Sequence, residues 1–391
     1  GTNKRATRAK NTGQTGKAHG AGGRKAAFSI QPVLYTTMRL TKLKLSHFRN
    51  IGALALDIPE DAPLIALIGP NGSGKTSILE AVSLLTPTRG MLTADGKSQI
   101  HHGAKEWGIW AQLHSGAELG QVYRKSERIL QIDGHREPLE ATARHGSIVW
   151  LTPTTDFLFS GPPANRRRWL DDLTTALIPA HAGACQRFTQ HRQSRLKLLT
   201  EGRGGDWLDA EERLAAEWGI QVLKHRIEYL ARLQPFLGGV SLALHGNALE
   251  VMEADNPVHA LKGKFERSRE IDTRMGRTHA GPNTLELTGV LTLENGQQVK
   301  LSEASSGQHK RGLIHWLVGH VQLLAQAQSR PPLVLVDEFS AHLDAKRRAD
   351  LLTTLTTAGC QVWLTDTDVP AITLPNLHVI HMQEGNLDAA A

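Results

Sequence analysis

The chain has 391 residues, of which 40% are hydrophobic and 21% charged, proportions typical of a globular protein. No apolar run approaches the ~20 residues that a membrane helix needs, and the first residues lack the apolar stretch of a signal peptide. These features argue against a membrane-spanning or secreted protein. The two cysteines, Cys185 and Cys360, have no metal-ligand spacing, and we expect free thiols in a reducing cytosol.

The formal net charge of +7 comes from the amino-terminal segment. Residues 1–37 hold seven basic and no acidic side chains, so the remaining chain is neutral overall. Overall charge therefore gives no support to DNA binding, although a local basic stripe would still permit it. The segment has few large apolar residues, and we expect a disordered basic tail upstream of a natural start at Met38. A DNA-binding arm is the alternative interpretation.

The hydrophobic pattern after Met38 predicts a mixed α/β body interrupted by a helical block. The run at 64–68 is apolar throughout, as expected for a strand buried on both faces. The other expected elements are, in chain order, strands at 40–45 and 53–58, a helix through 78–85, short strands within 107–150, helices from about 164 to 237, strands within 285–301 around an Asn295-Gly296 turn, a helix at 307–327, and strands at 333–336 and 362–364.

A glycine-rich loop follows the strand at 64–68 and matches the pattern G-x-x-x-x-G-K-[ST] at every fixed position. Its residues are Gly69, Pro70, Asn71, Gly72, Ser73, Gly74, Lys75 and Thr76, with Ser77 next along the chain. Glycines let backbone N–H groups point inward around phosphate oxygens, and the following helix adds partial positive charge. We expect Lys75 to reach the β- and γ-phosphates of ATP and the Thr76 hydroxyl to ligate Mg²⁺. An ordinary strand-to-helix turn is the alternative.

Four apolar residues, 333–336, precede the acidic pair Asp337-Glu338, which is a Walker-B pattern. A buried strand would carry Asp337 to its carboxyl end, beside the glycine-rich loop, where its carboxylate can hold Mg²⁺. Glu338 would then polarise the attacking water as a general base, so we expect Glu338 and Lys75 to be the catalytic pair. The alternative for Glu338 is an acidic residue favoured by a helix dipole.

Two further motifs define the class of ATPase. The sequence Ser305-Ser306-Gly307-Gln308 resembles the ABC signature, in which Ser305, Gly307 and Gln308 would meet the nucleotide of an opposite subunit. A helix cap is the alternative interpretation. The segment from Ser340 to Asp344 resembles the D-loop that follows Walker B. Because a signature of this type cannot reach its own nucleotide, the sequence predicts that ATP holds two heads together as a homodimer.

A family resemblance emerges from longer segments. Residues 43–50, Leu-Lys-Leu-Ser-His-Phe-Arg-Asn, with the glycine-rich loop resemble the start of RecF, SMC and RecN proteins. More specific are 150–161 and 166–171, which resemble the RecF pattern of a strand, a proline-containing turn and an Arg-Arg helix. Thr365 and Thr367 stand where transporter ATPases carry a switch histidine. The resemblance to RecF spans most of the chain from 38 to 391.

The RecF resemblance implies an ABC-type P-loop ATPase head with mixed sheets and an inserted helical domain. We accordingly expect a first head lobe at 38–155, a helical domain at 156–270 and the second part of the head at 271–391. The resemblance also places Arg49 near the nucleotide, with a solvated surface role as the alternative.

In function, the resemblance implies a cytoplasmic, nucleoid-associated DNA-repair ATPase. Such a protein would bind single-strand/duplex DNA junctions without reading sequence, dimerise with ATP, and hydrolyse it slowly under DNA stimulation. It would act with RecO and RecR to load RecA at gaps, and would not associate with a membrane.

Three positions depart from the family pattern. RecF proteins commonly carry Gly-Pro-His-Arg before the signature, whereas here Gly281-Pro282 is followed by Asn283-Thr284. No glutamine identifies the Q-loop, for which the turn at 153–156 is our candidate. The usual Asp-Asp of Walker B is Asp-Glu in this chain, which favours hydrolysis.

A basic cluster in the helical block is the candidate DNA surface. It comprises Arg166, Arg167, Arg168, Arg187, Arg192, Arg195 and Lys197, against two acidic residues, Asp171 and Asp172. Such side chains could contact phosphates without reading sequence, in which case binding depends strongly on salt. A solvated helix face with local ion pairs is the alternative.

Three other classes of ATPase remain as alternatives. A transporter ATPase subunit would need a switch histidine after 362–364 and a Walker B much nearer to Walker A. An SMC-like clamp would need long coiled-coil arms, and no sustained heptads are present. A nuclease-linked ATPase would need a further cluster of metal-binding carboxylates.

Overall fold

The computed structural model describes residues 38–391 except 93, 343–344, 370–375, 384 and 388–391. The expected tail at 1–37 therefore lies outside the described residues. The described part belongs to one compact unit that contains three sheets. Among the helices described, none combines the length and apolarity needed to cross a bilayer.

A parallel sheet forms the centre, with strand order β15-β14-β3-β13-β12-β8. Its strands are β3 (Leu64–Ile68), β8 (Ile148–Leu151), β12 (Leu333–Val336), β13 (Val362–Asp366), β14 (Leu377–Gln383) and the short antiparallel β15 (Asn386–Leu387). Strand β3 is buried at all five positions and lies between β13 and β14. Alternate residues of β3 enter two separate cores, which explains why its sequence is apolar throughout.

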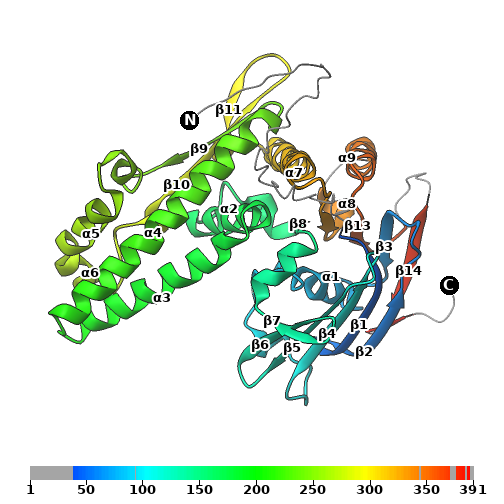
Figure 1. The fold of residues 1–391 in the computed structure, drawn as a ribbon. Helices are drawn as coiled ribbons and strands as arrows, with labels where there is room; N and C mark the ends of the chain where they lie inside the picture. Colours follow the sequence, from blue (N-terminus) through cyan, green and yellow to red (C-terminus); the bar gives the residue numbers. More distant parts are fainter. Residues whose placement is uncertain (1–37, 93, 343–344, 370–375, 384, 388–391) are drawn as a thin grey trace, which may run out of the picture. The chain divides into compact units, whose positions relative to one another are not determined.

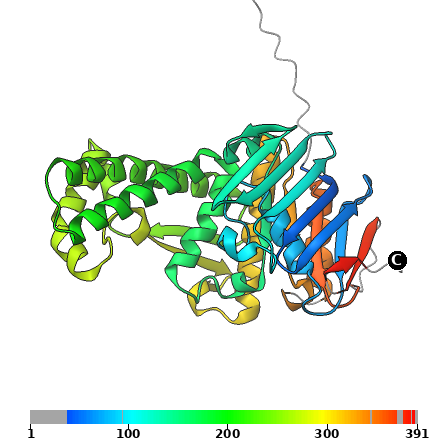
Figure 2. The ribbon, with the colours of Figure 1, turned by 90° about the horizontal axis from the view of Figure 1, so that it is seen from below.

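An antiparallel sheet lies on one side of the parallel sheet and shares a core with Ile65 and Leu67 of β3 (Figure 1). It runs β2-β1-β4-β5-β6-β7, and its blue and cyan strands lie side by side in Figure 2. The strands are β1 (Leu40–Phe48), β2 (Ile51–Asp57), β4 (Trp107–Leu113), β5 (Glu118–Arg124), β6 (Glu127–Ile132) and β7 (His135–Glu137). Helix α1 (Lys75–Ser83) packs into the same core through Ile78, Leu79 and Val82.

Helices pack on the opposite face of the parallel sheet, and others form the helical block. They are α2 (Pro163–Leu177), α3 (Ala180–Thr200), α4 (Asp206–Leu233), α5 (Pro257–Arg267), α6 (Arg269–Met275), α7 (Ser306–Gln328), α8 (Phe339–His342) and α9 (Ala345–Thr357). A third sheet, β11-β10-β9, consists of β9 (Val240–His245), β10 (Glu286–Thr292) and β11 (Gln298–Lys300). The long helices α3 and α4 lie side by side (Figure 1), with Phe188 and Leu223 in their common core.

Short 3-10 helices make up the remaining regular structure. They are η1 (Gly96–Gln99), η2 (Leu139–Arg144), η3 (Pro153–Phe157), η4 (Gln234–Phe236), η5 (Glu250–Glu253), η6 (Pro282–Thr284) and η7 (Leu301–Glu303).

Most expected elements are confirmed, including the strand at 64–68 and the turn at Asn295-Gly296, where Gly296 has a φ of 81°. Three strands were not predicted, β9, β14 and β15. The helices α5 and α6, which follow β9, and the helices α8 and α9, which follow β12, were also not among the expected elements. Strand β8, expected in the first lobe, pairs with β12 of the expected second part, so the two parts of the head share one sheet.

Candidate phosphate-binding site

The glycine-rich loop connects the carboxyl end of β3 to the start of α1. Gly74 has a φ of 99°, a conformation that side chains other than glycine rarely adopt. At Gly69, a Cβ atom would lie 2.2 Å from the carbonyl oxygen of Met382, so β14 leaves room only for glycine. The loop backbone is thus shaped by the strand beside it as well as by its own sequence.

Lys75 lies inside this loop. Its ammonium Nζ donates to the carbonyl oxygens of Gly69 (2.7 Å) and Pro70 (2.8 Å). Burial lowers the pKa of Lys75, and the nearby Asp337, Asp366 and Glu338 carboxylates act in the opposite direction. A buried cation held by carbonyl dipoles is well suited to receive a polyanionic ligand.

Walker A and Walker B meet directly. The Thr76 hydroxyl donates to Oδ1 of Asp337 at 2.9 Å, across 261 residues of sequence. The same carboxylate oxygen accepts a hydrogen bond from the Thr365 hydroxyl at 2.7 Å. Three segments, at the ends of β3, β12 and β13, therefore converge on one carboxylate at the carboxyl edge of the parallel sheet, where α/β proteins bind ligands.

Glu338 has an unusual backbone. Its φ of 51° lies in the left-handed region, which costs a non-glycine residue about 1 kcal/mol or more. The strained conformation is held by its N–H, which donates to the Thr365 hydroxyl at 2.8 Å. The Glu338 side chain is exposed and lines the cavity beside the loop. Backbone strain of this kind is common at functional sites, where it fixes the orientation of a side chain such as that of Glu338.

A cavity of about 720 Å³ lies in front of these groups. Its lining residues are Asn50, Asn71, Gly72, Gly74, Lys75, Thr76, Ser77, Glu338, Ser340, Thr365, Asp366 and Thr367. Ser340, the first residue of the predicted D-loop, binds Asp366 through both its N–H and its hydroxyl. The other D-loop residue, Asp344, lies outside the described residues.

Sequence reasoning missed two polar residues of this cavity. Asn50 donates to the Gly72 carbonyl at 3.0 Å and accepts from the Ser77 hydroxyl at 2.8 Å, so it joins the middle of the loop to the first turn of α1. Asp366 is buried and orients Ser340. Asn50 ends the segment at 43–50, and Asp366 ends a buried strand. Either position could have identified the residue as part of the cavity.

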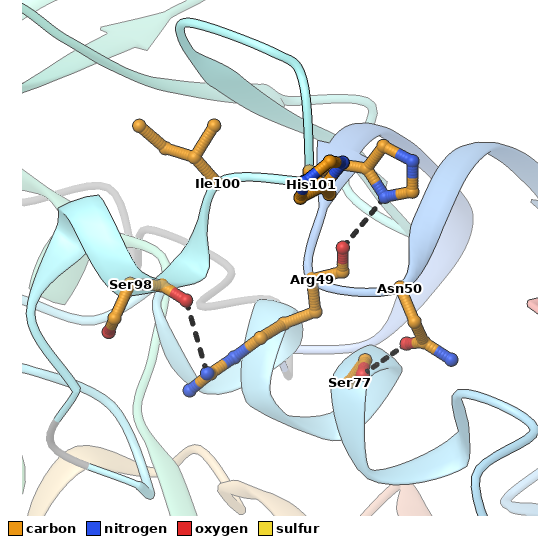
Figure 3. A pocket seen from close by; sticks show the side chains of 7 residues that line it. Arg49, Asn50, Ser77, Ser98, Ile100 and His101 are labelled. Carbon is orange, nitrogen blue, oxygen red and sulfur yellow. Dashed lines mark hydrogen bonds between the residues drawn. The ribbon is translucent and has the colours of Figure 1, made fainter.

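Arg49 lies in an adjoining pocket of about 680 Å³ and does not line the phosphate-loop cavity (Figure 3). Its guanidinium makes two 2.7 Å hydrogen bonds to Glu80 and a longer one to the Ser98 carbonyl. The bond to Glu80 raises the pKa of Arg49. Arg49 is thus neither freely solvated nor directed at the loop, although the two cavities share Asn50 and Ser77.

The signature-like segment caps helix α7. Ser305 and Gln308 form a capping box, with the Gln308 side chain accepting from the Ser305 N–H at 3.0 Å. Ser305 and Gly307 are exposed, and none of Ser305, Gly307 and Gln308 lines the phosphate-loop cavity of the same chain. The helix cap of the alternative interpretation is therefore present, and Ser305 and Gly307 remain exposed within it.

Comparisons with known proteins agree with this geometry. A family model described as an AAA domain matches residues 42–106. A DNA replication and repair protein RecF from Mesorhizobium japonicum is 32% identical over 360 residues, covering 84% of this chain and 91% of the relative. The RecF of Rhizobium meliloti is 33% identical over 352 residues, covering 84% and 92%. The chain belongs to the RecF family.

Solved RecF structures share the fold. The recombination mediator protein RecF of the RecFOR pathway, as RecF-ATPrS, superposes with a TM-score of 0.76 at 19% identity, over 91% of this chain and 99% of that one. Its RecF-ATP form gives 0.74 at 20% identity, over 90% and 99%. The ABC-type head with mixed sheets is confirmed, and the transporter and SMC-clamp alternatives are not favoured.

The predicted DNA-binding arginines of this RecF protein divide into two groups. The prediction is wrong for Arg166 and Arg195, which are buried and bound by protein carbonyls and carboxylates. Arg195 has no exposed side-chain surface and pairs with Glu212 and Asp272. A cation enclosed in this way cannot reach a DNA phosphate.

The other members of the basic cluster are accessible to different degrees. Arg167 and Arg192 are half-buried, and Arg167 donates to the Leu285 carbonyl at 2.7 Å. Arg168, Arg187 and Lys197 are exposed. Arg187 stacks 4.4 Å above the Trp218 ring, and Lys197 lies 3.9 Å from Glu201, so neither exposed side chain is without a protein contact.

The two atypical motifs of this RecF protein have structural roles. Residues 153–156, the Q-loop candidate, begin η3 and do not line the phosphate-loop cavity. Gly281 has a φ of 91° and opens a turn in which the Pro282 carbonyl accepts from Arg226.

Cys185, expected in no metal-ligand setting, lies 3.3 Å from the His181 ring, which also binds Asp171. Arg226 makes two hydrogen bonds to the same carboxylate. The cluster is thus an ion-paired junction of α2, α3 and α4.

Proposed function

We propose that this RecF-family chain is an ATP-hydrolysing recombination mediator of DNA replication and repair. The observation that carries the proposal is the 2.9 Å contact between Thr76 and Asp337, because it joins a phosphate-binding loop to an acidic strand end. The relatives are named as DNA replication and repair proteins, and the solved structures of matching fold are RecF bound to ATP or ATPrS.

The donor set suits Mg²⁺. A hydroxyl and a carboxylate are hard oxygen ligands of the kind that Mg²⁺ prefers beside phosphates, and Thr76 and Asp337 supply one of each. A bound Mg²⁺ would neutralise charge on the β- and γ-phosphates. Lys75 would bind those phosphates, and Glu338 would accept a proton from the attacking water. The Thr365 hydroxyl contacts both Walker-B residues, because it donates to the Asp337 carboxylate and accepts from the Glu338 backbone N–H.

The adjoining pocket would receive the nucleoside end of ATP. It continues from the phosphate-loop cavity through Asn50 and Ser77, and its further lining is Arg49, Ser98, Ile100, His101 and His102 (Figure 3). This arrangement supports a role for Arg49 that is indirect, since its guanidinium holds Glu80 while its backbone carbonyl binds His101.

The exposed cap of α7 supports an ATP-dependent homodimer. Ser305, Gly307 and Gln308 would reach the γ-phosphate held by the opposite copy. Slow, DNA-stimulated hydrolysis, binding to DNA junctions, and action with RecO, RecR and RecA are the finer parts of this proposal.

The test is sedimentation of the full chain with and without MgATP and a gapped duplex. Glu338→Gln should trap a dimer with ATP, whereas Lys75→Ala should prevent ATP binding. Ser305→Arg should keep ATP binding and lose the dimer, with Ser241→Arg, an exposed serine of β9, as matched control. A Glu338→Gln protein that stays monomeric at saturating MgATP would refute the dimer. A wild-type ATPase indifferent to DNA, with no salt-sensitive DNA binding, would refute the repair role.

A further inference from the structure

A short segment leaves β8, the strand paired with the Walker-B strand β12, and leads toward the signature helix α7. We call residues 152–161 the connector. It starts where β8 ends, and the Leu151 carbonyl just before it accepts a hydrogen bond from the Asp337 N–H at 2.9 Å. A capping box between Thr152 and Thr155 then fixes its first turn. The backbone of Asp337 is thus tied directly to the root of the connector.

The buried Arg166 closes the other end of the connector. One guanidinium nitrogen donates to the carbonyls of Leu158, Phe159 and Gly161 at 3.1, 3.0 and 2.7 Å. The second terminal nitrogen binds Glu286 of β10. A single planar cation thus holds three carbonyls within four residues, which fixes the backbone at this end of the connector.

His309 joins the connector to the signature helix. The Phe159 N–H donates to Nε2 of His309 at 3.0 Å, and the two rings pack with centroids 5.6 Å apart. His309 is 4% exposed. Its own N–H donates to the Ser305 carbonyl at 2.8 Å, which is the first hydrogen bond of α7. His309 therefore links the connector to Ser305, the serine that we propose faces a second copy.

We propose that His309 is a positioning residue for the ATP-dependent dimer: its unprotonated Nε2 keeps Ser305 in register with the connector and hence with Asp337. This inference rests on the proposed function, because it concerns how the signature is presented to the nucleotide of the opposite copy. A histidine that only filled the core would contribute volume, whereas the proposed role requires an acceptor at the Nε2 position.

Two amide variants separate these roles in the Glu338→Gln protein. His309→Gln places an acceptor near Nε2, whereas His309→Asn places it near Nδ1, out of reach of Phe159. Both should keep the per-subunit affinity for MgATP within about twofold, because His309 does not line the phosphate-loop cavity. His309→Asn should weaken the dimer about tenfold, the effect of one lost hydrogen bond, and His309→Gln should restore it.

The readouts are isothermal titration for ATP and sedimentation equilibrium for the dimer, with Tm recorded for each variant. Equal dimer affinity for the Gln and Asn variants would overturn the inference, as would an Asn variant that also loses ATP affinity. If the parent Glu338→Gln protein never dimerises, the proposed homodimer fails and this inference with it. A dimeric parent with indistinguishable variants removes the inference alone.

Discussion

The phosphate-binding site and the helical block use charged residues in opposite ways. In the site, Lys75 and Glu338 line an open cavity, and the buried Asp337 lies directly behind Thr76, which also lines it. In the helical block, Arg195 and Arg166 are enclosed, and their partners are protein groups. The contrast shows that a local charge pattern predicts function only where the backbone leaves a cavity in front of it.

The largest expected effect tests the enclosed group. Arg195→Met should destabilise the fold by about 3 to 5 kcal/mol, because it leaves Glu212 and Asp272 buried without their shared cation. Lys197→Met, two residues along the same helix, should change stability by less than about 0.5 kcal/mol. Urea denaturation measures both. Equal stabilities would mean that the Arg195 network is not a structural element.

The next effect tests the open group. Thr76→Val keeps the side-chain volume but removes the hydroxyl that meets Asp337, so hydrolysis should fall roughly 10- to 100-fold, as for groups that hold or orient a metal. The unfolding free energy should stay near wild type. Initial rates across a Mg²⁺ titration give the readout; an unchanged rate would remove Thr76 from the proposed Mg²⁺ site.

A smaller effect concerns pH. His320 is fully buried, and burial lowers its pKa to about 3. Since the unfolded chain binds this proton near pH 6.5, His320 makes stability fall as pH drops below 6.5, by about 1.4 kcal/mol between pH 7.5 and 5.5. His320→Asn keeps an acceptor for the Tyr229 hydroxyl without titrating. The wild-type loss over this range should exceed the variant's by that amount; parallel curves would contradict it.

The smallest effect addresses the exposed cations. Lys197→Gln should lower the slope of log K for duplex DNA against log salt by about one, if its 76% exposed side chain neutralises a phosphate. Lys300→Gln, with a 68% exposed side chain in β11, is the matched control. Fluorescence anisotropy at four salt concentrations would suffice. Identical slopes would exclude Lys197 from the DNA surface.

Much of the site was predictable because its functional groups belong to motifs that are contiguous in the sequence. The loop at 69–76 and the pair Asp337-Glu338 each follow an apolar strand, and parallel strands bring their carboxyl ends together. Asn50 and Asp366 were missed because each acts through a neighbour's backbone or hydroxyl and belongs to no phosphate motif.

The buried arginines could not have been identified from spacing. The Arg195 partner Asp272 lies 77 residues away, and the Arg166 partner Glu286 lies 120 residues away. Only the folded arrangement, which brings α3 beside α6 and α2 beside β10, reveals those pairs. The unpredicted β9 likewise depends on its partner, since a six-residue edge strand needs β10 for its hydrogen bonds.

The strand order of the parallel sheet has a consequence for synthesis on the ribosome. Both neighbours of β3, namely β13 and β14, are translated after Pro332. Until then the nascent chain carries the glycine-rich loop at the end of an apolar strand with two unpaired edges, which invites aggregation. We therefore expect that truncated chains ending before β12, which lack β13, β14 and Asp337, would not bind nucleotide. They would depend on chaperones to stay in solution and would not be partly active forms of the protein.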